Sequence, residues 1–354
     1  MKIKILRAFN GDAILISFKD KENKNRNILI DGGTRGTYEY NDKRTRKPVS
    51  GNLKLSLEEI KQKGEKIDLL ILTHVDNDHI DGIVKWFEED EEAHSLIGKT
   101  WFNSGRLIAE LFGEQENEEF LIPMFITEGT DTGIKQGVLV ENFIEEHSIW
   151  DRRIIKDKTE LFEFDIRIRI ISPSIENLEM LLEKWEEEEP DTLTAGKEND
   201  YQISLKDLIE KDKFREDNSV HNGSSIAFIL TYESKNLLLL GDAYPSTLIN
   251  GLKYFGYSAE SPLKAELVKV SHHGSKANTS YELLSLIDCD KFIISTNGRS
   301  HNLPNKQCLA RIISSKPNAS LYFNYPDIIN EIFNSQDYRE FRFSALPCDE
   351  EFTI

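Results

Sequence analysis

One polar segment constrains the fold of this chain more than any other feature of its sequence. The apolar run IDLLIL (67–72) is followed directly by THVDNDHIDG (73–82), which places two imidazoles and several carboxylates within ten residues. A continuous apolar run is typical of a strand covered on both faces, and the later part of the segment has a helical pattern. A buried strand that ends in His and Asp side chains predicts a layered α/β fold with a site at its strand ends.

The spacing within this segment suits a metal site. His74, Asp76 and Asp78 alternate along the chain, so their side chains can point toward one centre, and His79 reaches a neighbouring point. Imidazole and carboxylate are ligands that suit Zn, Mn or Fe. The alternative is a polar loop that only caps the following helix, with Asp78 near the helix start.

The pattern of a strand followed by polar residues recurs four more times. The side chains at these strand ends are Asp31 in ILIDGG, Asp242 in LLLLGDA, His272 and His273 in KVSHHGS, and His301 in ISTNGRSHNLP. Catalytic groups gather on loops that follow core strands, so the recurrence favours a metal site over a helix cap. His94 and His147 are interpreted as surface residues. His221 is either a ligand or substrate contact or an ordinary loop residue.

This ordered set of motifs resembles the metallo-β-lactamase-fold superfamily of metallohydrolases. HxDxDH with GDA, HHGS and a final SHNLP is most similar to the hydrolase domain of ComEC-type DNA-uptake proteins and their stand-alone relatives. The resemblance covers residues 3–320 and implies a four-layer αββα fold, in which two mixed β-sheets are sandwiched between helices. We expect residues 1–354 to form a single domain of this kind, with variable surface insertions at 105–160 and 190–218.

The resemblance also implies a centre of two divalent metal ions, Zn or Mn. Its ligands would be His74 and Asp76 on the first ion, Asp78, His79 and His301 on the second, and Asp242 bridging both. Catalytic roles fall to Asp78, His272 and His273, and one of the two histidines would complete a coordination shell or contact the scissile group. Asp31 would orient a ligand imidazole from behind.

Two departures from the wider superfamily matter. Asp76 stands where the common signature has a histidine, and this third carboxylate hardens the site, which favours Mn over Zn. The separate mid-chain histidine motif is unclear, with Asn218, His221 and Ser224 as candidates.

We therefore expect a metal-dependent phosphodiesterase or nuclease that acts on a nucleic acid or a nucleotide. One alternative is a thioester, lactone or amide hydrolase of the same fold. Another is a sensing or assembly component of a bacterial defence system, acting with partner proteins from the same operon. The metal motifs do not separate these functions, because the fold hosts many chemistries.

Charge limits how such a protein could hold a polyanion. With 44 Lys+Arg against 62 Asp+Glu the net charge is −18, which argues against a general nucleic-acid coat. One dense basic cluster, Lys43, Arg44, Arg46 and Lys47, follows ILIDGG, and we expect it to border the metal site and contact substrate. The alternative is a solvated loop. Lys276 is a further possible substrate contact or proton donor.

The remaining composition predicts a cytoplasmic protein without a membrane partner. No apolar run approaches the roughly 20 residues of a membrane helix, and polar residues interrupt the N-terminus before a signal-peptide core can form. Cys289, Cys308 and Cys348 are odd in number and widely spaced, so we expect no disulfide framework. The strictly alternating run LFEFDIRIRIISPS (161–174) predicts one strand.

Overall fold

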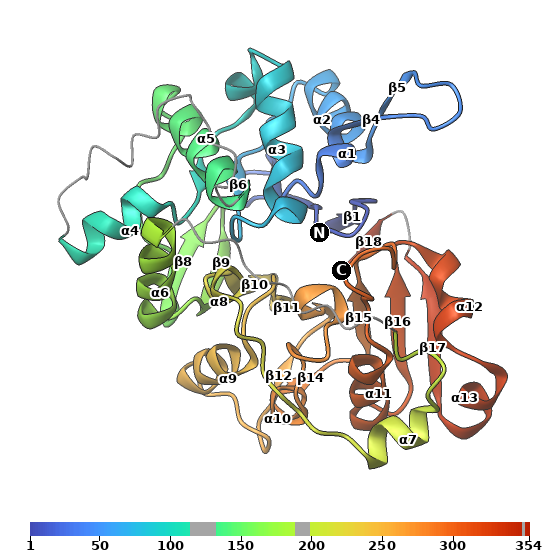
Figure 1. Cartoon of the computed structure of the whole chain (residues 1–354). Coiled ribbons are helices and arrows are strands. Elements are labelled where there is room, and N and C mark those ends of the chain that lie inside the picture. The colour runs from blue at the N-terminus through green and yellow to red at the C-terminus, as the bar shows by residue number, and fades with distance from the viewer. Residues whose placement is uncertain (114–131, 188–198, 349–350) are drawn as a thin grey trace.

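The computed structural model describes residues 1–113, 132–187, 199–348 and 351–354. Two β-sheets lie face to face, with helices on the outer face of each (Figure 1). This arrangement confirms the predicted four-layer αββα fold. Of the two expected insertions, 105–160 and 190–218, the parts at 114–131 and 190–198 lie outside the described residues.

The first sheet has six strands. They are β1 (Lys2–Ile5), β2 (Ile14–Lys19), β3 (Asn25–Ile30), β6 (Leu69–Ile71), β7 (Thr100–Trp101) and β18 (Phe352–Thr353). Their spatial order is β18-β1-β2-β3-β6-β7. The first three strands pair antiparallel, and β6 then adds parallel to β3 with Ile30 opposite Ile71. The buried run at 67–72 therefore contains a strand that is paired on both sides, by β3 and β7.

The second sheet has eight strands. They are β8 (Thr159–Glu163), β9 (Ile166–Ser172), β10 (Ala227–Tyr232), β11 (Lys235–Leu239), β13 (Leu267–Lys269), β15 (Lys291–Ile294), β16 (Ala319–Phe323) and β17 (Phe343–Pro347). Their order is β17-β16-β15-β13-β11-β10-β9-β8. The pairs from β8 to β11 are antiparallel, and those from β11 to β17 are parallel. Two small pairs lie apart, β4 (Glu39–Asn41) with β5 (Pro48–Ser50), and β12 (Leu263–Lys264) with β14 (Ile287–Asp288).

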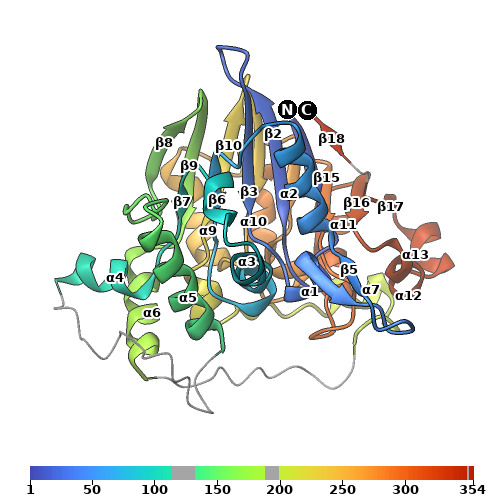
Figure 2. The same cartoon turned by 90° about the horizontal axis from the view of Figure 1, so that it is seen from above.

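Helices cover the outer faces of both sheets (Figure 2). On the side of the first sheet lie α1 (Arg35–Tyr38), α2 (Asn52–Gln62), α3 (Asn77–Glu89), η1 (Ala93–Leu96), α4 (Gly105–Phe112), α5 (Thr132–Glu146), α6 (Ile175–Glu187) and α8 (Val220–Gly223). On the side of the second lie α7 (Leu205–Glu210), α9 (Pro245–Tyr254), η3 (Ser271–Gly274), α10 (Tyr281–Ser285), α11 (Lys306–Ser315), η4 (Pro326–Ile328), α12 (Ile329–Ile332) and α13 (Ser335–Glu340). Among the described residues, the helices are too short or too polar to cross a bilayer.

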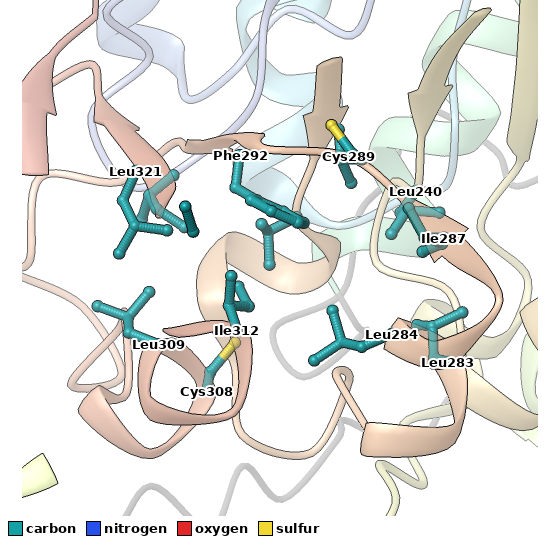
Figure 3. Packing of buried hydrophobic residues seen from close by; sticks show 14 of the residues in the cluster. Leu240, Leu283, Leu284, Ile287, Cys289, Phe292, Cys308, Leu309, Ile312 and Leu321 are labelled. Carbon is teal, nitrogen blue, oxygen red and sulfur yellow. The ribbon is translucent and has the colours of Figure 1, made fainter. Parts of the chain in front are cut away.

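Three apolar cores join these four layers. The middle core lies between the sheets, where alternate residues of β9 such as Ile166, Ile168 and Ile170 meet side chains of the first sheet such as Ile16 and Ile28. A second core packs the first sheet against α2, α3 and α5. The third packs α10 and α11 against β15 and β16 (Figure 3). Because successive side chains of a strand point to opposite faces, each sheet contributes apolar residues to the cores on both of its faces.

The alternating run 161–174 is not one strand, as its pattern predicted. It forms a hairpin, because β8 ends at Glu163 and β9 starts at Ile166. Phe164 and Asp165 between them have positive φ angles of 50° and 67°. Two consecutive residues with positive φ make the tight turn that matches strand twist in a hairpin. The alternation continues across the turn and hides it.

A buried ion pair ties α11 to α13. Lys306 Nζ donates to Asp337 Oδ2 at 2.8 Å, and both side chains are buried. Asp337 also forms a capping box with Asn334 at the start of α13 and accepts from the Leu205 N–H. The carboxylate therefore connects three helices.

We expect Asp337→Ala to lower the free energy of unfolding by about 3–5 kcal/mol, because it leaves the Lys306 ammonium buried without its partner. Urea denaturation followed by circular dichroism measures this loss. Glu282→Ala is the control, since its pair with Lys253 is more than half exposed and removing it costs about 1 kcal/mol or less. Equal losses in both variants would contradict the assignment of Asp337 as a structural tie.

Candidate metal centre

The predicted site residues follow strands that end at one edge of the two sheets. In the first sheet, Asp31 follows β3 and His74 follows β6, and these strands are parallel. In the second sheet, Asp242 follows β11 and His273 follows β13, and these strands are also parallel. Carboxyl ends of parallel strands meet at the same edge, so both sheets deliver side chains to one place.

One carboxylate oxygen lies at the centre of the cluster. Asp242 Oδ2 is 3.3 Å from His79 Nε2, 3.5 Å from His273 Nε2 and 3.9 Å from His74 Nε2. Asp242 is almost fully buried, and its backbone N–H donates to Ser225 Oγ at 3.0 Å. Asp242 Oδ2 therefore lies between imidazoles that come from both sides of the sheet-to-sheet contact.

On one side of Asp242 lie His74, Asp76 and His221. His74 Nε2 is 3.6 Å from Asp76 Oδ2, and His221 Nδ1 is 2.6 Å from Asp76 Oδ1. Asp76 is the residue that precedes α3, yet its side chain makes no capping hydrogen bond. The carboxylate faces the cluster instead, which argues against a role limited to capping the helix.

On the other side lie Asp78, His79 and His273. His273 Nε2 is 3.4 Å from Asp78 Oδ2, and the rings of His79 and His273 have centroids 5.2 Å apart. The amide of Asn10 donates to Asp78 Oδ2 at 3.1 Å. Asp12 Oδ1 lies 3.5 Å from His273 Nδ1.

Hydrogen bonds behind the imidazoles fix their orientation. Asp31 accepts from Thr73 N–H and Thr73 Oγ1, and its Oδ2 is 2.8 Å from His79 Nδ1. Thr73 Oγ1 is also 3.0 Å from His74 Nδ1, and His273 Nδ1 is 2.8 Å from the Ser295 carbonyl. With each Nδ1 held from behind, each Nε2 points into the cluster, which is the arrangement expected of metal-binding histidines.

The donor atoms fit divalent metal ions. Nε2 of His74, His79 and His273 and Oδ1 of Asp242 are buried and make no hydrogen bond with the described residues. Buried polar atoms without partners are rare in folded proteins and call for a ligand or a water. Two overlapping groups, His74 with His79 and Asp242, and Asp12 with His79 and His273, bring ligand atoms within 4.8 Å of one another.

Electrostatics make this cluster attractive to cations. Burial opposes ionisation of Asp242, but the charges of His79 and His273 outweigh it and hold its pKa well below the ordinary value. Burial likewise opposes protonation of His273, yet Asp242 and Asp12 raise its pKa to about 10. Carboxylates that stay ionised at a buried site attract positive charge, which protons on the imidazoles or a metal ion can supply.

A buried lysine lies beneath the cluster. Lys269, at the end of β13, forms an ion pair with Asp12, and its Nζ is 3.8 Å from Asp242 Oδ1. Burial would lower the pKa of Lys269, but Asp12 and Asp242 outweigh it and raise that pKa. The ammonium therefore stays charged beside Oδ1 of Asp242, whereas Oδ2 is the oxygen that lies near the imidazoles.

His301 and His272 occupy different places from those expected of inner ligands. His301, expected on the second metal, is exposed in the loop before α11, and His273 stands by Asp78 instead. His272 has a side chain 22% exposed, against 2% for His273. Both residues of the HHGS turn have positive φ, 47° and 53°, and this conformation directs His273 inward. Lys276 and the basic cluster 43–47 are exposed and outside the ring of donor atoms.

Sequence reasoning missed three residues of this site and left a fourth open. Asn10 and Asp12 carried no predicted role, and Lys269 lies within an apolar strand. The sequence leaves two interpretations of His221, a ligand or substrate contact and an ordinary loop residue. In the structure His221 is buried against Asp76. A lysine within a buried strand is itself a signal, because lysine is almost never fully buried unless it is paired.

A glycine holds the first hairpin against the metal-binding loop. Gly11 lies so close to the Asp78 carbonyl that a Cβ at this position would collide with it. The Asp12 N–H donates to the same carbonyl at 3.1 Å. The backbone around Asp78 is thus set by a residue with no side chain, in another part of the chain.

Residues 6–147 match the family model of the metallo-beta-lactamase superfamily. Solved structures also match, among them the crystal structure of the metallo-beta-lactamase fold protein YhfI from Bacillus subtilis. That structure is 11% identical, with a TM-score of 0.37, and the match covers 98% of this chain and 96% of that one. The comparison with curated proteins gives no match.

The match includes the segment from His74 to His79 and ends before Asp242 and His273. Those two residues are brought to the same edge by the second sheet. The fold is that of a metallo-β-lactamase-type domain. Together with the grouped His and Asp donors, it indicates a metal-dependent hydrolase.

We expect His273→Ala to lower the metal content of the purified, dialysed protein, whereas His301→Ala retains it. His273 contributes a buried Nε2 beside two carboxylates, and His301 is an exposed histidine on a nearby loop. Asp242→Ala should lower the content furthest, because both sides of the cluster share its Oδ2. Elemental analysis per chain decides this, and metal loss in His301→Ala alone would show that His301, and not His273, is the ligand.

We expect Lys269→Met to lower the free energy of unfolding of the metal-free protein by about 3–5 kcal/mol, because Asp12 is left buried without its partner. The double variant Asp12→Asn with Lys269→Met should recover part of this loss. A double-mutant cycle by urea denaturation measures the coupling. Additive effects of the two substitutions would show that the pair does not act as a unit.

Proposed function

We propose that this chain is a metal-dependent phosphodiesterase that hydrolyses the phosphodiester bond of a nucleic acid or a nucleotide. The observation that carries the proposal is the pair of adjoining donor sets that share Asp242 Oδ2. The HxDxDH, GDA and HHGS motifs support it, because their combination is most similar to the hydrolase domain of ComEC-type DNA-uptake proteins.

In this proposal, each of the two donor sets holds one divalent ion. His74, Asp76 and His221 would hold one divalent ion, Asp78, His79 and His273 the other, and Asp242 would contact both. Two divalent ions, when bound, activate water at neutral pH and stabilise the attacking and leaving oxygens of an in-line displacement at phosphorus. The three carboxylates in this set favour hard ions such as Mn²⁺ over Zn²⁺, compared with a site built of histidines.

Residues outside the inner ring would hold the catalytic geometry. Asp31 fixes the ring of His79 directly, and it fixes that of His74 through Thr73. The Ser295 carbonyl fixes the ring of His273. Rigid imidazoles place substrate oxygens reproducibly between the two donor sets, which lowers the entropic part of the barrier.

His272 is the residue placed to move a proton. Its Nδ1 is 3.0 Å from Asn278 Oδ1 and 3.4 Å from Asp217 Oδ2, which holds the ring. Its Nε2 is 3.9 Å from Asp242 Oδ2, and the side chain is partly exposed, unlike that of His273. In this proposal, Nε2 of His272 donates a proton to the leaving oxygen as the bond to phosphorus breaks.

A substrate panel tests the reaction class. We expect turnover of bis(p-nitrophenyl) phosphate and of a short oligonucleotide, with greater activity in Mn²⁺ than in Zn²⁺, and loss of turnover in Asp78→Asn. A thioester, a lactone and an amide in the same panel test the other hydrolase classes. Turnover of one of these with none of the phosphodiesters would overturn the proposal.

The role of His272 as proton donor can be tested separately, by comparing two leaving groups. A p-nitrophenolate leaves without a proton, whereas a nucleoside alkoxide needs one. We expect His272→Gln to slow cleavage of a dinucleotide by about 10²–10⁴-fold, the usual contribution of a general acid, and to slow the nitrophenyl ester much less. Metal content should be unchanged. Equal slowing of both substrates would mean that His272 positions the site rather than donating the proton.

A further inference from the structure

An aromatic rim adjoins the metal centre through two consecutive residues. The side chain of Asn10 contacts Asp78, and Phe9 beside it lies between two tyrosines. The Phe9 N–H donates to the hydroxyl of Tyr325 at 2.7 Å. The ring of Phe9 meets that of Tyr40 edge-on, with centroids 5.8 Å apart. Tyr40 is 41% exposed, and Phe9 and Tyr325 are partly exposed, so three rings reach the surface next to the site.

Phe9 is held in an unusual backbone conformation. Its φ angle is +63°, which is rare for a bulky residue other than glycine. The N–H bond to Tyr325 and a bond from Asn297 N–H to the Phe9 carbonyl, at 2.7 Å, hold this conformation in place. Local strain that the surrounding structure maintains is a mark of functional sites.

Two arginines lie on the side of the rim formed by Tyr325. The guanidinium of Arg7 lies over the Tyr325 ring, 5.8 Å from its centroid. Arg299 follows two residues after Asn297, whose N–H donates to the Phe9 carbonyl. Burial raises the pKa of Tyr325, while the Phe9 N–H and the charges of Arg7 and Arg299 act in the opposite direction. Arg7 and Arg299 are exposed.

Tyr40 belongs to β4, which pairs with β5 to form a small hairpin. The loop between these strands carries the basic arm, defined here as Lys43, Arg44, Arg46 and Lys47, all exposed. Asp42 closes the loop by accepting from the N–H groups of Arg44 and Thr45. Figure 2 places this hairpin at the end of the molecule opposite the two termini.

Among the described residues, acidic side chains pair with neighbouring cations but not with these. Within the part of the chain that the structure describes, Arg35 pairs with Asp81 and Lys54 pairs with Glu39. No ion pair is formed there by Arg7, Arg299 or the basic arm. In a chain of net charge −18, six unpaired cations beside exposed rings form a localised attraction for a polyanion.

We propose that the rim of Phe9, Tyr40 and Tyr325, extended by the basic arm, binds a single-stranded nucleic acid and leads its backbone to the metal centre. The cations would contact successive phosphates, and the rings would stack on unpaired bases, which a duplex does not expose. This inference rests on the proposed phosphodiesterase function and adds a substrate class to it: a strand of several nucleotides rather than a free nucleotide.

Binding rather than turnover tests this inference. Fluorescence anisotropy of a labelled 20-nucleotide oligothymidylate, and of the matching oligouridylate, gives the affinity at a series of salt concentrations. We expect replacement of all four basic-arm residues by Ser to weaken binding at least about tenfold at moderate salt. The log–log salt slope should fall by up to about 3, since each lost contact with a single strand contributes about 0.7.

The matched control removes four exposed cations from the opposite end of the molecule. Lys19, Lys21 and Lys24 lie at the turn between β2 and β3, and Lys235 lies at the turn between β10 and β11. Replacing them by Ser gives the same net charge, so an effect of total charge alone would weaken binding equally in both variants. Equal weakening would overturn the assignment of the basic arm. Thermal unfolding of both variants checks their folding.

The aromatic part is tested separately. We expect Tyr40→Ala to weaken oligonucleotide binding about fivefold or more, the effect of losing one stacked base, and Tyr40→Phe to restore it. Equal affinity for a 20-base-pair duplex would overturn the single-strand assignment. If the wild-type protein binds neither strand yet hydrolyses the chromogenic diester, this inference fails while the proposed function stands. Absence of hydrolysis together with firm strand binding would show the reverse.

Discussion

The structure around the metal centre depends on burying several carboxylates at one place. Asp12, Asp31 and Asp242 are buried there, Asp76 and Asp78 lie beside them and are partly exposed, and the ammonium of Lys269 pairs with Asp12. Uncompensated charges in a protein interior cost several kcal/mol each, so this group persists only if positive charge is supplied. Lys269 supplies part of it, and the carboxylates raise the pKa values of His79 and His273 against the effect of burial, which favours positive charge on those rings. A divalent ion would be a further source of positive charge.

The geometry of the centre is set by contact between the two sheets. His74 follows β6 of the first sheet and His79 lies in the first turn of α3 after it, whereas Asp242 and His273 follow strands of the second sheet. The distance across the centre therefore reflects how the middle apolar core fills the space between the sheets. That core is made of β-branched and aromatic side chains such as Ile30, Ile71 and Phe228, which have few alternative packings. Changes in core volume there would be felt at the metal-binding atoms.

Much of this could be predicted from the sequence, because the information was local. Strands that end in His or Asp are visible as short patterns that predict a layered α/β fold, and the resemblance of the ordered motifs to a known superfamily implied the two sheets. The orientation of HHGS was not visible, because it depends on two residues with positive φ. The roles of Asp12 and Lys269 depend on a contact between β13 and the first hairpin, which no spacing reveals. The short strands β17 and β18 carry weak patterns of their own and are fixed by pairing with β16 and β1.

Gly11 affects how a scan of single substitutions in this chain would be interpreted. A scan of single substitutions that scores only loss of function would rank Gly11 with the ligands, although it has no chemistry to offer. Any side chain there displaces the backbone of Asp78, and with it one donor of the centre. Gly82 would also rank as intolerant, because a Cβ at this position in α3 would collide with the Gly32 carbonyl. A map of intolerant positions would thus outline where backbones touch as well as where metals bind.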